Sequence, residues 1–173
     1  MLHLVQTVLL FAFPALVIVG AMRDAVSFTI PNWISIALAA AFLPTALIMG
    51  ASPSQIGIAC LIGLATLIAG MGMFAVGWIG GGDAKLFAAA GLWMGLGALL
   101  SYLLVTALAG GALAVMLLAL RSVWLRPLVS RGPGWIGRLA TPGENVPYGI
   151  AIAFGALAAF PESLLTALFR GLS

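Results

Sequence analysis

The stretch that decides the fold is Leu86–Leu120, LFAAAGLWMGLGALLSYLLVTALAGGALAVMLLAL, which contains no charged residue. One membrane-spanning helix of that length would exceed the hydrocarbon core by about half. Three glycines interrupt the stretch between residues 91 and 97. We therefore predict two apolar helices, 84–98 and 100–120, joined by a tight turn near Gly95–Ser101.

The rest of the chain also has the composition of a membrane protein. Of its 173 residues, 64% are hydrophobic and 6% are charged, whereas soluble domains carry about 25% charged residues. The breaks at Gly, Pro and charged residues predict spans at 4–22, 32–50, 56–75, 84–98, 100–120 and 148–169. We predict an all-α, polytopic membrane protein with about six transmembrane helices and one membrane-embedded domain over residues 1–173.

The basic residues predict the orientation of these helices. Lys85 and every arginine except Arg170 lie in or beside the predicted loops 23–31, 76–83 and 121–147. The positive-inside rule then places these loops in the cytoplasm and both termini outside. We attribute the net charge of +3 to topology signals and lipid-headgroup anchors and predict no nucleic-acid partner. The long last loop is an alternative docking site for a partner or an acidic substrate segment.

Two of the four acidic residues lie where apolar segments break. Asp24 follows the first predicted span, and Asp83 lies in the string Gly80-Gly81-Gly82-Asp83-Ala84-Lys85. The predicted orientation brings both to the cytoplasmic membrane face, where ionisable residues often mark a functional site. The structural alternative is that each aspartate caps a helix or pairs with Arg23 or Lys85.

Two carboxyl groups within a few ångströms of each other can hydrolyse a peptide bond. They cannot both ionise cheaply, so one of them keeps a proton. The ionised group can take a proton from an attacking water, and the protonated group can give its proton to the oxyanion or leaving amine. No cofactor is needed, and the lone Cys60 and lone His3 predict no metal site.

Three motifs occur together in the chain. They are Asp24-Ala-Val-Ser-Phe-Thr-Ile30-Pro31-Asn32, Gly80-Gly81-Gly82-Asp83-Ala84-Lys85-Leu86 and Val146-Pro147-Tyr148-Gly149. By their order and loops, the chain resembles the type IV prepilin peptidases, which are GxGD aspartyl membrane proteases, and in particular their short CpaA/TadV-like branch. The resemblance implies that Asp24 and Asp83 are the catalytic pair of a single peptidase domain.

The resemblance also implies a substrate and a location. Members cut the short basic leader from prepilins at the cytoplasmic face of the bacterial inner membrane, and this branch points to Flp-type prepilins of a tight-adherence pilus. The expected partners are the prepilin, the lipid bilayer and other pilus assembly proteins. The chain lacks the cytoplasmic insert with paired cysteines found in larger bifunctional relatives, so we predict no methyltransferase activity. It also lacks basic residues between Asp24 and Ile30, where many relatives carry them.

Residues around the pair are assigned supporting roles. Gly80 and Gly82 are expected to let a substrate backbone approach closely. We expect Lys85 to point away from Asp83 and to extend its ammonium toward lipid phosphates. Tyr148 has two open roles, a hydrogen bond in the site or a place in the interfacial aromatic belt.

Local capping is expected at the starts of two spans. Pro31 and Pro147 suit the first turn of a helix, with Asn32 and Asn145 available to bond loose backbone groups. Glu144 is expected to be a solvated loop residue. Glu162 is expected to lie near the external face without a part in the chemistry.

Two other classes of function stay open. One is a GxGD intramembrane protease of broader specificity, resembling the presenilin and signal-peptide-peptidase group, although the Ile-Pro-Asn and Pro-Tyr-Gly strings favour a prepilin peptidase. The other is a non-enzymatic transporter or assembly subunit whose aspartates bind protons or cations. No predicted span carries a charge near its middle, where transport sites usually lie.

Overall fold

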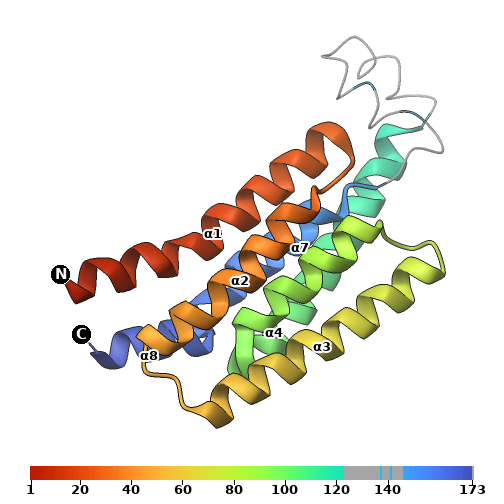
Figure 1. The fold of residues 1–173 in the computed structure, drawn as a ribbon. Helices are drawn as coiled ribbons and strands as arrows, with labels where there is room; N and C mark the ends of the chain where they lie inside the picture. Colours follow the sequence, from red (N-terminus) through yellow and green to blue (C-terminus); the bar gives the residue numbers. More distant parts are fainter. Residues whose placement is uncertain (123–136, 138–140, 142–145, 173) are drawn as a thin grey trace.

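The computed structural model describes residues 1–122, 137, 141 and 146–172, and this part of the chain is helical without strands (Figure 1). Its elements are α1 (Leu2–Ser27), α2 (Asn32–Ile48), α3 (Pro53–Ala75), α4 (Gly81–Leu120), α7 (Tyr148–Ala159), the 3-10 turn η1 (Phe160–Glu162) and α8 (Leu164–Leu172). Four segments are long and apolar enough to cross a membrane: His3–Ser27, Pro53–Ala75, Gly81–Leu120 and Tyr148–Gly171. The apolar helix Asn32–Ile48 is shorter.

Most of the last predicted loop lies outside the described residues. This applies to the interpretations placed on Arg126, Arg131, Arg138, Glu144 and Asn145.

The long helix α4 folds back on itself at Gly95. This residue has φ 62° and ψ −173°, a non-helical conformation inside the element that is open essentially to glycine alone. The Tyr102 hydroxyl donates a hydrogen bond to the Phe87 carbonyl at 3.0 Å, whereas the two residues would lie about 22 Å apart along a straight helix. The predicted break in the charge-free stretch is therefore confirmed at Gly95, and the two arms of α4 run antiparallel (Figure 1).

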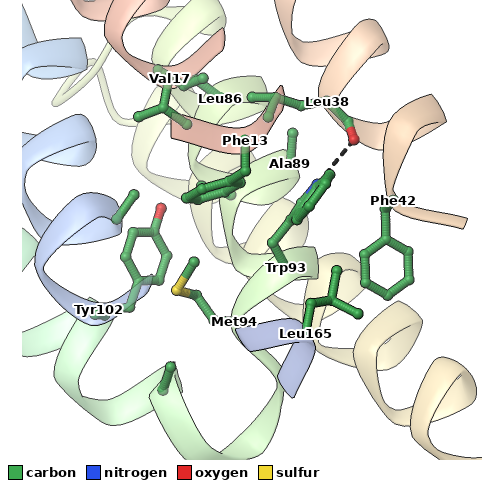
Figure 2. Packing of buried hydrophobic residues seen from close by; sticks show 14 of the residues in the cluster. Phe13, Val17, Leu38, Phe42, Leu86, Ala89, Trp93, Met94, Tyr102 and Leu165 are labelled. Carbon is green, nitrogen blue, oxygen red and sulfur yellow. Dashed lines mark hydrogen bonds between the residues drawn. The ribbon is translucent and has the colours of Figure 1, made fainter. Parts of the chain in front are cut away.

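The first arm of α4 lies in the middle of the bundle and carries the core. Trp93 is fully buried and its ring contacts Phe13 of α1 and Phe42 of α2 (Figure 2). Its indole N–H donates to the Leu38 carbonyl at 3.0 Å, which satisfies the ring's polar atom inside apolar surroundings. This packing fixes the first arm of α4 relative to α1 and α2.

The ends of two predicted spans differ from the expectation. Helix α1 continues to Ser27 and ends at Phe28, which adopts the left-handed conformation with φ 55°, so the predicted loop 23–31 shrinks to four residues, 28–31. The last span, predicted as one helix over 148–169, is broken by η1, where Pro161 cannot donate a helical hydrogen bond.

Candidate functional site

Asp24 lies in the last turn of α1 and is 3% exposed. Its Oδ2 accepts a hydrogen bond from the backbone N–H of Gly149 at 2.7 Å. Gly149 is the second residue of α7, so its N–H is one of the helix-start donors that have no partner inside their own helix. The carboxylate of α1 thus joins the start of a helix 125 positions later in the chain.

Asp83 lies in the first turn of α4 and is 5% exposed. Its Oδ2 accepts the N–H of Gly80, the residue that caps this helix, at 2.9 Å. Asp83 therefore stands three positions inside the cap, and it performs the capping role considered in the sequence analysis with one oxygen only. Its other oxygen, Oδ1, is buried and has no hydrogen-bond partner among the described residues.

The structure brings the two carboxylates into one site. The charge of Asp83 acts on the Asp24 carboxyl group, so the two side chains lie close to each other. In the described part of the chain, neither Arg23 nor Lys85 has an electrostatic effect on the carboxyl groups of Asp24 and Asp83. The ion-pair alternative for the aspartates therefore has no support.

Ile30 packs against the backbone beside Asp83 and against the start of α7, whose Gly149 bonds Asp24. A Cβ built on Gly82 would lie 3.0 Å from both the Cβ and the carbonyl oxygen of Ile30. A Cβ on Gly149 would lie 2.9 Å from Ile30 Cδ1 and 2.8 Å from Asp24 Oδ2. These glycines let α4, α7 and the residue before Pro31 approach closely. The access that Gly82 would give to a substrate backbone stays a prediction.

Asn32 and Lys85 form a polar pair beside the aspartates. The Lys85 ammonium donates to Asn32 Oδ1 at 2.8 Å. The amide oxygen of Asn32 is therefore bound by a lysine of another helix, and its capping role at the start of α2 stays a prediction.

The two prolines stand one position earlier than predicted. Pro31 and Pro147 are the residues immediately before α2 and α7, and their carbonyls accept the N–H groups of Ile34 at 3.1 Å and Ile150 at 3.2 Å. They fix the start of each helix without being part of its first turn.

Tyr148 lines a cavity of about 290 Å³ that adjoins the site. Ile79, which precedes Gly80, and Phe87, one turn after Asp83, lie in the same wall. Residues four positions apart share one helix face, so this cavity lies on the same side of α4 as Asp83. It is a candidate space for an apolar segment that reaches the carboxylates.

Two contributors to the site escaped prediction from the sequence. Gly149 and Ile30 occur inside the recognised motifs, but the role of Gly149 is a backbone N–H and that of Ile30 is steric, so neither carries a side-chain signal. Among the described residues, no group of three or more His, Cys, Asp or Glu side chains forms a metal-binding cluster.

A comparison with protein families gives one match. The model of the type IV leader peptidase family matches residues 11–115, more than half of the chain, including both aspartates. The chain belongs to the type IV leader peptidase family. Searches of curated proteins and of solved structures found no match. Gly149 lies outside the matched range, so its link to Asp24 comes from the structure alone.

Proposed function

We propose that this member of the type IV leader peptidase family is a prepilin peptidase in which Asp24 and Asp83 are the catalytic residues. The observation that carries the proposal is the burial of both carboxylates in one site, with Asp24 bonded to the N–H of Gly149 and Asp83 Oδ1 without a hydrogen-bond partner among the described residues. Burial beside a second carboxyl group favours sharing of a proton over full ionisation of both groups. A pair in that state offers a general base and a general acid at once.

The proposed reaction uses the pair in two steps. The ionised carboxylate takes a proton from water while the water oxygen bonds to the scissile carbonyl carbon, and the protonated carboxyl group donates its proton to the carbonyl oxygen. The tetrahedral intermediate then collapses: the C–N bond breaks, the leaving amine takes a proton from the first carboxyl group, and the second carboxylate takes back a proton from a hydroxyl of the intermediate as the new carbonyl forms. The unpartnered Oδ1 of Asp83 supports this role, since it retains capacity for a water or a substrate atom.

The proposed substrate is a Flp-type prepilin with a cytoplasmic leader and an apolar helix. In the proposed topology the protein has six spans in the bacterial inner membrane, external termini and the aspartates at the cytoplasmic face. The prepilin helix would lie in the bilayer, with its first apolar residues entering the cavity lined by Tyr148, Ile79 and Phe87. The scissile bond would then stand at the level of the aspartates, next to that cavity.

We propose cleavage without methylation of the new N-terminus. The test is incubation of the purified protein and prepilin with methyl-labelled S-adenosylmethionine. Label in the cleaved pilin would contradict this part of the proposal.

The activity is tested by co-expression with a candidate Flp-type prepilin, followed by mass analysis of the pilin product. We expect loss of the leader by one cut between the leader and the apolar helix. A cut inside the helix would favour an intramembrane protease of broader specificity. An uncut prepilin, with the enzyme at a normal membrane level, would contradict the assigned substrate.

A further inference from the structure

Residues of α2, α3 and the first arm of α4 line a groove of about 550 Å³. Lys85 and Asn32 line its mouth, and Ala88 and Ala89 line its floor. Lys85 lies two positions after Asp83, about 200° around the helix. The groove therefore lies on a different face of α4 from the aspartates and from the cavity lined by Tyr148.

The mouth of this groove carries a positive charge. The Lys85 ammonium uses one donor on Asn32 Oδ1, at 2.8 Å, and an ammonium has three donors. Both side chains are exposed. Two N–H donors thus remain for an anionic oxygen at the end of the groove nearest the start of α4.

A second polar group lies one turn further along α2. Ser35 is 7% exposed and lines the groove, and its Oγ is buried without a hydrogen-bond partner. Leaving a buried hydroxyl unsatisfied costs about 1–3 kcal/mol. A hydroxyl without a partner keeps its capacity to donate to an acceptor that enters the groove.

The lining of the groove indicates what it can hold. The groove extends from Lys85 to Leu92 along α4, a length of about 10 Å, and beyond Lys85 and Asn32 its lining is mainly apolar. An extended acyl chain fits this lining, and a basic peptide leader would be repelled by Lys85.

We propose that this groove binds one phospholipid with a net negative headgroup. The phosphate bonds the Lys85 ammonium, a glycerol ester carbonyl accepts from Ser35 Oγ, and an acyl chain extends over Ala88 and Ala89 toward Cys60. The proposal concerns binding and does not depend on the peptidase reaction, so loss of cleavage in an aspartate variant leaves it untouched.

Cys60 provides a direct probe, because it is the only cysteine in the chain, is exposed and lines the groove. The full-length protein is placed in nanodiscs of phosphatidylcholine, with or without a minor fraction of phosphatidylglycerol. The rate of N-ethylmaleimide addition is measured by intact mass. We expect about tenfold slower addition with phosphatidylglycerol, the factor given by one charge-assisted hydrogen bond. Lys85→Gln should abolish the difference, and Ser35→Ala should reduce it.

The matched control moves the thiol by one position, in the double variant Cys60→Ser/Leu61→Cys. Leu61 is exposed and lies outside the groove, so its replacement should react at the same rate in both lipids. Equal rates at Cys60 in the two lipids, or full protection retained in Lys85→Gln, would overturn the proposal. Protection of Cys60 by prepilin in phosphatidylcholine alone would also overturn it and assign the groove to the substrate.

Discussion

Both ends of the helical bundle have acidic side chains near a glycine-containing turn, but these side chains differ in burial and in hydrogen bonding. At the end where α1 and α4 meet, Asp24 and Asp83 are buried, and Asp83 Oδ1 has no partner among the described residues. At the opposite end, Glu162 is exposed and its Oε2 accepts the Ser101 hydroxyl at 2.7 Å. Asp83 therefore has an oxygen that can still accept a hydrogen bond, whereas the carboxylate of Glu162 stabilises a turn.

The Thr166 hydroxyl, at the same end as Glu162, is also hydrogen-bonded. Thr166 Oγ1 donates to the carbonyl of Phe160 at 2.9 Å and lies 3.0 Å from Ser163 Oγ. Such satisfaction is the norm for buried polar groups, and exceptions call for an explanation. The comparison shows that hydrogen-bond satisfaction, more than residue type, separates a structural carboxylate from a candidate for chemistry.

The largest expected difference between the two ends is in catalysis, because only the buried aspartates should be needed for cleavage. Asp24→Asn and Asp83→Asn should each lower the cleavage rate by about 10²–10⁴, because each removes a proton-transfer group while keeping an oxygen to accept its backbone N–H. Leader loss from prepilin is the measurement, with membrane levels checked by immunoblot. A normal rate in either variant would return that aspartate to a structural role.

The second largest loss of cleavage is expected from a substitution at the contact between α1 and α7. Gly149→Ala places a methyl group 2.8 Å from Asp24 Oδ2, so the carboxylate must move. We expect about a 100-fold loss of cleavage, the effect of a misplacement of about 1 Å. Gly57→Ala is the control, because a Cβ there meets nothing within 4 Å. Equal activity of the two variants would show that the position of Asp24 tolerates change.

At the opposite end, substitution should change stability and spare the chemistry. Gly95→Ala forces a side chain into a conformation with φ 62° and places its Cβ 3.1 Å from Leu164 Cβ. The conformation alone costs about 1–3 kcal/mol. Thermal unfolding in detergent should show the loss, while the rate per folded enzyme stays near the wild-type value. An unchanged melting temperature would contradict the assigned turn.

The smallest effect is expected at the exposed carboxylate. Glu162→Gln keeps an oxygen that can accept from Ser101, so stability should fall by less than about 1 kcal/mol. Prepilin cleavage should be unchanged, as measured by the same loss of the leader. A loss of cleavage comparable with that of Asp24→Asn would remove the distinction between the two ends.

Much of the fold follows from the sequence because apolar length and glycine breaks act locally. The charge-free stretch required a turn, and Gly95 provides it. The ends of α1 and of the last span were missed because charge patterns do not show where a backbone leaves the helix. Phe28 in a left-handed conformation and the 3-10 turn at Pro161 depend on packing with neighbouring helices.

The sequence predicted the aspartate side chains of the candidate site but not the backbone and packing contacts that position them. The position of Asp24 beside Asp83 was expected from topology, but the N–H of Gly149 and the packing of Ile30 depend on contacts between distant segments. Asn32 was assigned to a cap because that role needs only local sequence. Its bond to Lys85 comes from a residue 53 positions away, a distance over which sequence pattern carries no information.

The central claim is that Asp24 and Asp83 act as one unit, and a double-variant cycle tests it most directly. Single-turnover cleavage of purified prepilin is measured for the wild type, Asp24→Asn, Asp83→Asn and the variant with both changes. Groups that act together lose their effect together, so all three variants should fall to the same residual rate. If the two single losses instead multiply in the double variant, or if one single variant keeps its rate, the two carboxylates act independently and the claim is wrong.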